Sequence, residues 1–169
     1  MKMYPLALGG FSYLESAEVP FWFVDSYRKN EEIEKNPKTM QKRYMAVKRE
    51  ARPLGKNLHE LRVLTEIRNG VSSLLPKYYI PMNIPGFDIN QNPIIMMDFL
   101  SDGSLGEYLK KRKRTVSLLT KVNLLFAASM ALKYLESYKI VHLDVKPNNF
   151  MISPGLLVKI IDFGESFHP

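Results

Sequence analysis

One stretch near the C-terminal end constrains the fold more than any other part of the chain. Residues 140–150 read IVHLDVKPNNF, and the tripeptide Asp162-Phe163-Gly164 follows. Asp144 and Asn149 are five residues apart in a segment whose proline and asparagines favour a loop. Between this loop and Asp162, two short apolar runs flank a Ser-Pro-Gly turn, which predicts a β-hairpin. The hairpin would return the chain to the loop, so that three oxygen-bearing side chains converge.

Convergence of this kind can hold a magnesium nucleotide. The spacing resembles the protein-kinase catalytic loop H-R-D-L-x-x-x-N followed by D-F-G, with Leu143 in place of the arginine. The two motifs occur in order, with their aspartates eighteen residues apart, which is far more specific than either motif alone. The chain therefore resembles a eukaryotic-type protein kinase catalytic domain of the serine/threonine-like kind. Because the sequence stops at Pro169, five residues past Gly164, we expect a domain truncated shortly after the second motif.

The resemblance implies ATP-dependent phosphoryl transfer to a protein hydroxyl, with ATP and Mg²⁺ as cofactors. Asp144 would orient the substrate hydroxyl and accept its proton, and Lys146 would help at the γ-phosphate. Asn149 and Asp162 would hold the magnesium ion. A lysine two places after the aspartate is typical of the serine/threonine type of loop, so serine or threonine is the expected acceptor rather than tyrosine.

Two N-terminal segments resemble the family's nucleotide-binding motifs. Residues 6–14 form two strand-like pieces around a glycine pair, where the family has its phosphate-covering loop, although only one glycine of three is kept. Residues 44–48 alternate like a half-buried strand and resemble V-A-I-K, which would place Lys48 near the α and β phosphates. In the family, the helix that supplies the carboxylate partner of this lysine has an apolar residue four places after its glutamate. Leu64 fills that place after Glu60, so the resemblance implies Glu60 as the partner, and Glu66 is its rival. The positions implied to contact the nucleotide here are Ala7, Gly9, Gly10, Ser12, Leu14, Ala46, Lys48 and Glu60.

A third segment resembles the hinge between the two lobes of a kinase. The apolar run at 94–97 leads into a Gly-Ser turn, which would put Met97 in the gatekeeper position beside adenine. The hinge residues expected to offer main-chain groups to the nucleotide are Asp98, Phe99 and Leu100. Another strand is expected at 78–80, after an insertion at about 15–44 to which we assign no chemistry.

The expected fold is therefore α+β and two-lobed, like that of a protein kinase. An N-lobe at 1–97 would hold an antiparallel five-stranded sheet and one helix. A hinge at 98–103 would lead to an incomplete, mainly helical C-lobe at 104–169.

Residues 117–138 predict a long helix whose apolar side chains point in nearly every direction, as in a helix that is buried all round. In complete kinases the corresponding helix is covered on one side by the catalytic-loop hairpin and on the others by later helices. The given sequence contains the hairpin but not the later helices. Several large side chains should therefore meet water or a partner chain. No window comes near eighteen apolar residues, so we expect no membrane span.

Composition sets limits on the remaining function classes. The chain has 169 residues, is 46% hydrophobic and contains no cysteine, which suits a globular protein without disulfides or thiolate metal sites. The first eleven residues do not resemble a signal peptide, and we expect an intracellular protein, cytoplasmic or nuclear. Five of the net +7 charges lie in Lys110–Arg114. That run is interpreted as a solvated helix end rather than a nuclear-import or nucleic-acid patch.

Two other functions stay open. A nucleotide-binding pseudokinase would explain the reduced glycine loop and the missing substrate platform, and phosphate release from ATP would separate it from an enzyme. A non-catalytic interaction fragment would use the bare long helix to dock on another chain, and a co-purifying partner would support it.

Overall fold

The computed structural model describes residues 3–8, 12–19, 43–50, 55–69, 83–88, 90–100, 102–112, 115–153 and 157–169. The chain divides into two compact units. The first comprises Met1–Leu54 and Asn83–Phe99, and the second comprises Gly55–Met82 and Leu100–Pro169. The division at Phe99 falls inside the segment 98–103 that the sequence suggests as a hinge. Residues 55–82, which the sequence analysis assigns to the N-lobe, group with the second unit instead.

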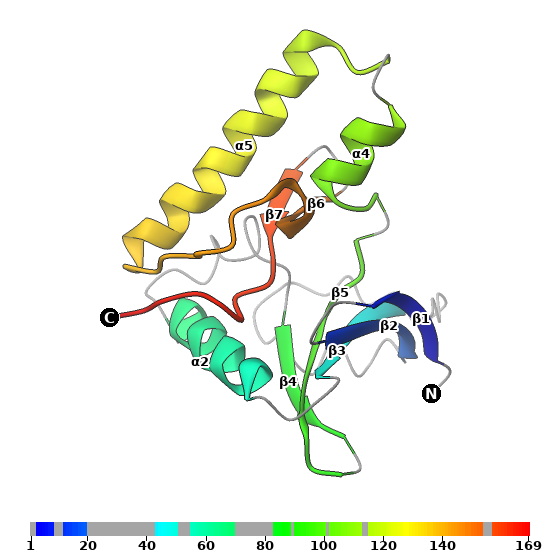
Figure 1. Cartoon of the computed structure of the whole chain (residues 1–169), viewed down its shortest axis with the longest axis vertical. Coiled ribbons are helices and arrows are strands. Elements are labelled where there is room, and N and C mark those ends of the chain that lie inside the picture. The colour runs from blue at the N-terminus through cyan, green and yellow to red at the C-terminus, as the bar shows by residue number, and fades with distance from the viewer. Residues whose placement is uncertain are drawn as a thin grey trace, which may run out of the picture. The chain divides into compact units, whose positions relative to one another are not determined.

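The first unit is a five-stranded sheet in the order β1-β2-β3-β5-β4, with antiparallel pairing between neighbours (Figure 1). Its strands are β1 (Met3–Leu8), β2 (Ser12–Val19), β3 (Arg43–Glu50), β4 (Asn83–Phe87) and β5 (Pro93–Asp98). Strand β3 lies at the centre and is buried at three consecutive residues, 45–47. Since successive side chains point to opposite faces, β3 is covered on both faces here and is not the half-buried strand that its alternation predicts.

Two strands of this unit differ from what the sequence analysis suggests. Strand β2 continues to Val19, so the predicted insertion does not begin at residue 15. The segment that holds Pro85 and Gly86 has the composition of a turn but forms β4, at the edge of the sheet. Proline is tolerated there because an edge strand leaves one row of backbone groups outside the ladder. The predicted strand at 78–80 and residues 20–42 of the predicted insertion lie outside the described residues.

The second unit contains three helices and a hairpin among its described residues. They are α2 (Lys56–Asn69), α4 (Leu105–Lys111), α5 (Leu118–Ser137), the 3₁₀ turn η1 (Pro147–Asn149), β6 (Phe150–Ser153) and β7 (Leu157–Ile160). Ser104 and Glu107 form a capping box that starts α4, and Ser117 caps α5 by accepting from the Thr120 amide. The predicted long helix and the predicted hairpin are both confirmed.

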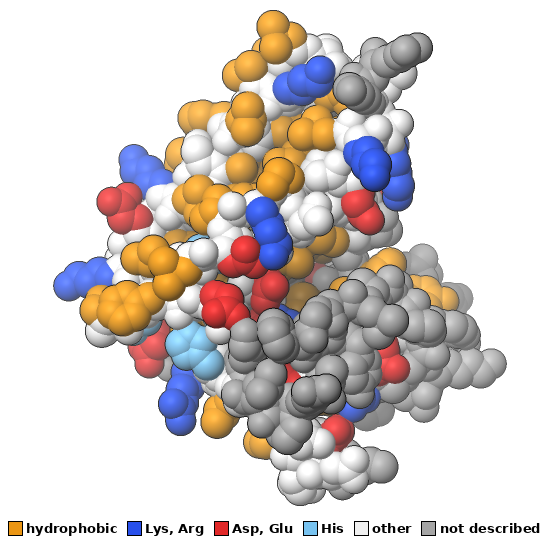
Figure 2. Space-filling view, in the orientation of Figure 1, with side chains coloured by type: hydrophobic (Ala, Val, Ile, Leu, Met, Phe, Trp, Pro, Cys, Tyr) orange, Lys and Arg blue, Asp and Glu red, His pale blue; other side chains and the backbone are white. Residues whose placement is uncertain are grey.

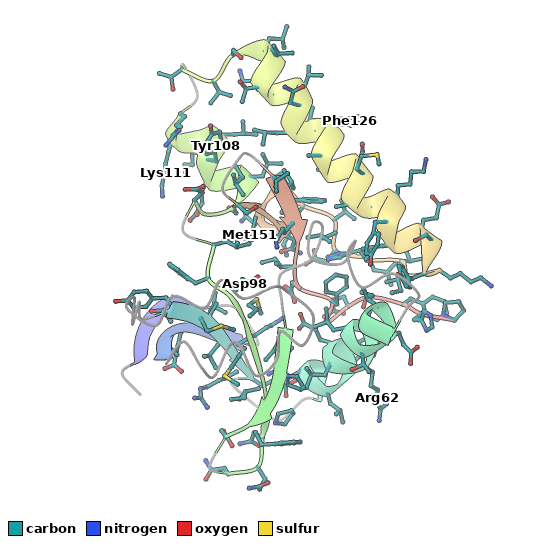
Figure 3. The ribbon with its side chains drawn as sticks, turned by 180° about the vertical axis from the view of Figure 1, so that it is seen from behind. Arg62, Asp98, Tyr108, Lys111, Phe126 and Met151 are labelled. Carbon is teal, nitrogen blue, oxygen red and sulfur yellow. The ribbon has the colours of Figure 1, made fainter. Side chains whose placement is uncertain are left out.

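Helix α5 is buried along one stripe and exposed along the other side. Leu124, Ala128, Ala131 and Leu135 recur at helical spacing and are buried, and the helix contacts β7. The exposed large side chains of α5 are Leu118, Leu119, Val122, Leu125 and Phe126. Hydrophobic side chains gather along this helix in Figure 2, and Phe126 is labelled on it in Figure 3. The prediction that several large side chains would be uncovered is therefore confirmed.

The same helix bears on the expectation that the chain has no membrane span. Among the described residues, α5 is the one helix that is long and apolar enough to cross a bilayer by length and composition. Core helices of soluble proteins satisfy the same criterion, so this finding is weak evidence for a span. The helix meets this criterion by its mean hydropathy although polar and charged residues interrupt its apolar run, and the absence of a membrane span stays a prediction.

Candidate catalytic and nucleotide site

Three of the predicted catalytic and metal-binding residues lie together in the loop after α5. Lys146 donates from Nζ to Asp144 Oδ2 at 2.6 Å. Asn149 donates from Nδ2 to the same oxygen at 2.9 Å and to the Asp144 carbonyl oxygen at 2.8 Å. The 3₁₀ turn η1 makes this geometry possible, because the Asn149 amide bonds back to the Lys146 carbonyl oxygen. The loop is thus closed on itself around one carboxylate.

These contacts also set the ionisation of the loop. The hydrogen bond from Lys146 holds the pKa of Asp144 below its ordinary value; partial burial opposes this effect and the bond from Asn149 adds to it. The same partner, Asp144, raises the pKa of Lys146, and the charge of Asp162 adds to that rise. Asp144 is therefore a carboxylate at neutral pH, with an ammonium group beside it.

The hairpin brings Asp162 back to this loop. Phe150 pairs with Ile160, which sets Asn149 opposite Ile161, and the Ile161 amide donates to the Asn149 carbonyl oxygen at 2.9 Å. Asp162 itself has a φ of 68°, in the left-handed region. Aspartate reaches that region more readily than most residues, but still at a cost. Asp162 is thus joined to Asn149 through a backbone bond made by its immediate neighbour.

His142 links the two loops, a role that the sequence analysis does not assign to it. Its buried ring lies 2.9 Å from the Ile161 carbonyl oxygen through Nε2. A carbonyl oxygen can only accept, so Nε2 carries the hydrogen and Nδ1 is the nitrogen that accepts from the Asp144 amide, at 3.3 Å. The ring also packs against Phe163, with centroids 5.3 Å apart. The only sequence signal for this role is its place two residues before Asp144.

Helix α2 reaches the same region through its own carboxylate. Glu60 is 1% exposed, and its Oε1 accepts from the Phe163 amide at 3.1 Å. Glu66, the rival candidate, is exposed on the same helix. Of the two candidate carboxylates, Glu60 is thus the buried one with a partner next to Asp162, and its pairing with Lys48 stays a prediction.

Four residues expected around the nucleotide in the first unit share one face of the sheet. Lys48 on β3 lies opposite Leu14 on β2 and opposite Ile95 on β5. Ala46, two residues before Lys48, lies opposite Met97. Residues directly opposite each other, and residues two apart on a strand, point to the same face.

The remaining predicted positions fall as follows. Ala7 pairs with Leu14, Ser12 starts β2 and Asp98 ends β5. Phe99 is the last residue of the first unit, and Leu100 begins the second segment of the second unit. Gly9 and Gly10 lie outside the described residues.

The chemistry of Asn149 and Asp162 fits a magnesium ion. Mg²⁺ prefers oxygen ligands and is commonly held by one or two protein groups, with substrate phosphates and water completing its shell. The bonds from Asn149 to Asp144 use its Nδ2 nitrogen, which makes the carbonyl oxygen Oδ1 the atom suited to coordination. In the described part of the chain, no three His, Asp or Glu side chains gather as an all-protein metal cage.

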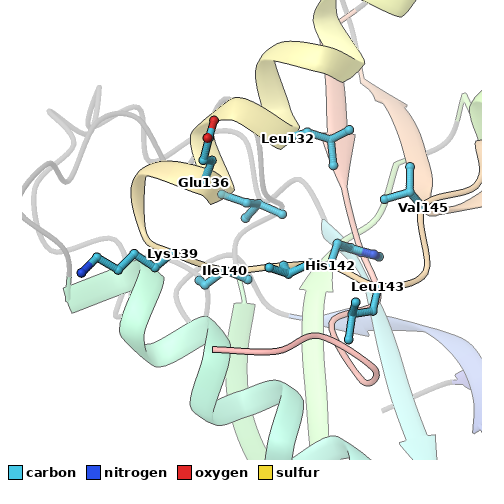
Figure 4. A pocket seen from close by; sticks show the side chains of 9 residues that line it. Leu132, Glu136, Lys139, Ile140, His142, Leu143 and Val145 are labelled. Atoms are coloured by element: carbon cyan, nitrogen blue, oxygen red, sulfur yellow. The ribbon is translucent and has the colours of Figure 1, made fainter. Parts of the chain in front are cut away.

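A surface hollow of about 550 Å³ lies beside the catalytic loop in the second unit (Figure 4). Leu132, Leu135 and Glu136 of α5 line it, together with residues 139–143 and Val145. None of the predicted catalytic or metal-binding side chains lines it, so this hollow is distinct from the predicted phosphoryl-transfer site.

The chain is similar in sequence to known protein kinases. It is 36% identical over 73 residues to a serine/threonine/tyrosine-protein kinase of Arabidopsis thaliana, a match that covers 43% of the chain and 19% of that protein. It is 38% identical over 82 residues to Fer-related kinase 1 of Caenorhabditis elegans, covering 48% and 20%. It is 29% identical over 100 residues to ephrin type-A receptor 5 of Homo sapiens, covering 57% and 10%. The matches thus cover a fifth or less of the length of each of these relatives.

A model of the family described as protein tyrosine and serine/threonine kinase matches residues 30–167. That match runs through the catalytic loop, the hairpin and the Asp-Phe-Gly tripeptide, the segments from which the site is built. The chain therefore belongs to the protein tyrosine and serine/threonine kinase family.

Proposed function

We propose that the chain carries out ATP-dependent phosphoryl transfer to serine or threonine hydroxyls of a protein, with Mg²⁺ bound beside the phosphates. The proposal includes a two-lobed kinase arrangement and an intracellular location, cytoplasmic or nuclear. The observation that carries it is Asp144, a carboxylate kept ionised by Lys146 and held in place by Asn149. Such a group is what a hydroxyl nucleophile needs as its base.

The contacts of Asp144 support a proposal of different tasks for its two oxygens. Oδ2 accepts from both Lys146 and Asn149, so Oδ1 would accept the hydrogen bond of the substrate hydroxyl and, during transfer, its proton. Lys146 would stabilise charge on the transferred phosphoryl group while keeping Asp144 ionised. Lys48 would neutralise charge on the α and β phosphates. Magnesium, when bound, would neutralise the charge that develops on the phosphate oxygens.

Preference for serine or threonine is the finer part of the proposal. Its support is Lys146, which lies two residues after Asp144 and bonds it directly, as the serine/threonine type of loop implies. The similar proteins include kinases named for serine/threonine and for tyrosine, so the acceptor is decided by assay. Peptide pools that offer either tyrosine or serine and threonine as acceptor would distinguish the two.

Nucleotide binding and transfer can be tested separately. Magnesium-ATP should raise the melting temperature of the unaltered chain, by an amount that grows with ligand concentration. Lys48→Met and Asp162→Asn should reduce the shift, whereas Glu66→Gln, an exposed change on α2, should keep it. Asp144→Asn should retain binding but lose labelled phosphate transfer. If a folded sample shows no melting shift at millimolar nucleotide, the proposal is wrong. A shift without any transfer would favour the pseudokinase function instead.

A further inference from the structure

One contact of helix α2 has no place in the function proposed above. His59, the residue before Glu60, has its Nε2 2.7 Å from the carbonyl oxygen of Ser166. Since that oxygen can only accept, Nε2 carries a hydrogen and donates. The two residues are 107 positions apart in the chain. The contact therefore joins α2 to the segment that follows the Asp-Phe-Gly tripeptide.

His59 and Glu60 hold the two ends of one tight turn. Glu60 accepts from the amide of Phe163, where the turn begins, and His59 donates to the carbonyl of Ser166, where it ends. The turn is closed internally, because the Ser166 amide and hydroxyl both donate to the Phe163 carbonyl oxygen. Ser166 is itself buried. Glu60 alone would attach only the Phe163 end of the turn to α2, whereas His59 attaches the Ser166 end to the same helix.

The turn is connected onward to both functional loops. Phe163 follows Asp162 directly and packs its ring on His142. Beyond Ser166, Phe167 exchanges two backbone hydrogen bonds with Val141, at 2.9 and 2.7 Å. A displacement of the turn would therefore be felt at the predicted magnesium ligand and at the start of the catalytic loop.

We propose that His59 is a positioning residue for Asp162. By fixing the far end of the turn to α2, it makes the Glu60 contact rigid and so imposes the left-handed backbone conformation of Asp162. A non-glycine residue keeps such a conformation only where its surroundings dictate it. The functional value of this positioning rests on the proposed role of Asp162 in holding magnesium, but the mechanical coupling does not.

Amide hydrogen exchange of the nucleotide-free chain tests the coupling directly. His59→Phe keeps the size of the ring and removes the donor, and His59→Ala does so without any bulk in case phenylalanine is not tolerated. His59→Gln restores a donor of similar reach. Arg62→Gln, at an exposed position of the same helix (Figure 3), is the matched control.

We expect the Phe163 amide to exchange roughly tenfold faster in the two donor-less variants, the effect of losing about one net hydrogen bond. It should stay within about twofold of the unaltered rate in His59→Gln and Arg62→Gln, since the donor is kept. Phe163 is the informative probe because its own bond is to Glu60, so a change there must be transmitted. Faster exchange confined to Ser166 and Phe167, or no change at all, would overturn the proposal.

A second measurement separates this inference from the proposed function. Binding of Mn²⁺ with ATP, followed by the paramagnetic signal of the metal, should weaken about tenfold in the donor-less variants and recover in His59→Gln. If the unaltered chain binds no metal nucleotide but Phe163 exchange still responds, the coupling stands and the proposed function fails. If the unaltered chain binds and His59→Ala binds equally well, His59 does not position Asp162.

Discussion

Two adjacent leucines of α5 give the sharpest test of whether this helix is uncovered in solution. Leu124 is 1% exposed and Leu125 is 64% exposed, on the same helix and with the same side chain. Replacing a buried leucine by alanine costs about 2–5 kcal/mol. Full burial of a leucine is worth roughly 1.5–3 kcal/mol, so a side chain about one-third buried contributes only about 0.5–1 kcal/mol. Leu124→Ala should therefore destabilise the chain several times more than Leu125→Ala.

The same estimate applies to the whole exposed side of α5. Its five large apolar side chains are between 52% and 78% exposed. Full burial of each side chain would contribute roughly 1.5–3 kcal/mol of stability, and about two-thirds of this is lost because the side chain is exposed. For the five side chains together, the lost stabilisation is about 5–10 kcal/mol. That is comparable to the entire stability of a small domain, roughly 5–15 kcal/mol. We therefore expect the chain, expressed alone, to self-associate, capture a partner or bind a hydrophobic dye.

Urea unfolding, followed by circular dichroism, measures the free energy of unfolding of the two alanine variants. Light scattering and dye fluorescence measure association. Leu125→Lys combined with Phe126→Lys should lower dye binding and association without loss of helix. If Leu125→Ala costs as much as Leu124→Ala, α5 is covered in solution, and the concentration dependence would show whether a second copy covers it. A dispersed monomer that binds no dye and melts cooperatively would contradict the reasoning.

Three other predictions concern the catalytic loop. Leu143 has a φ of 60°, so Leu143→Gly should be more stable than Leu143→Ala by about 0.5–1 kcal/mol, because relief of about 1–2 kcal/mol of left-handed strain exceeds the entropic cost of glycine. At Val145, whose φ is not positive, urea unfolding should instead show Val145→Gly to be less stable than Val145→Ala. Because Lys146 lowers the pKa of Asp144, Lys146→Met should raise the Asp144 midpoint in a carboxyl NMR titration. The unaltered chain should be more stable than Lys146→Met, and this difference should be fully present above pH about 4, the pKa of an unfolded aspartate. The difference should vanish as the pH falls through the lower pKa of folded Asp144. An unmoved midpoint would refute the pairing. Finally, kinases that have arginine before the catalytic aspartate use it to bind their phosphorylated activation segment, and Leu143 has no charge with which to do so. We therefore expect no activation by phosphorylation through this residue. Phosphatase-sensitive activity in the unaltered protein would contradict this.

The sequence predicts most of the second unit well because its signals are local. A turn flanked by two apolar runs specifies the hairpin, and a serine before a long apolar stretch specifies the start of α5. Strand β4, which the sequence analysis does not predict, depends on position in the sheet. Pro85 and Gly86 favour a turn by their composition. They can lie in a strand here because β4 is at the edge of the sheet, which the local sequence does not reveal.

Two features of the candidate site were beyond local inference. The grouping of α2 with the second unit accompanies bonds from His59 and Glu60 to residues more than a hundred positions away. The tautomer of His142 follows from what its two nitrogens contact, and nothing in the sequence specifies those contacts. Sequence spacing predicts which oxygen-bearing side chains converge, whereas the groups that hold them in place emerge only from the folded chain.

Two strained backbone positions, Leu143 and Asp162, show why the residues that hold the catalytic side chains in place matter. Leu143 and Asp162 both have positive φ, and each is next to a residue anchored by His142. Aspartate tolerates this conformation, but a leucine that is mostly exposed gains too little from burial to offset it. The conformation of Leu143 must therefore be imposed by its neighbours, the buried His142 ring on one side and the bonded Asp144 amide on the other. The position of the Asp144 carboxylate is then set by the chain's own contacts, at the expense of strain in the residue before it.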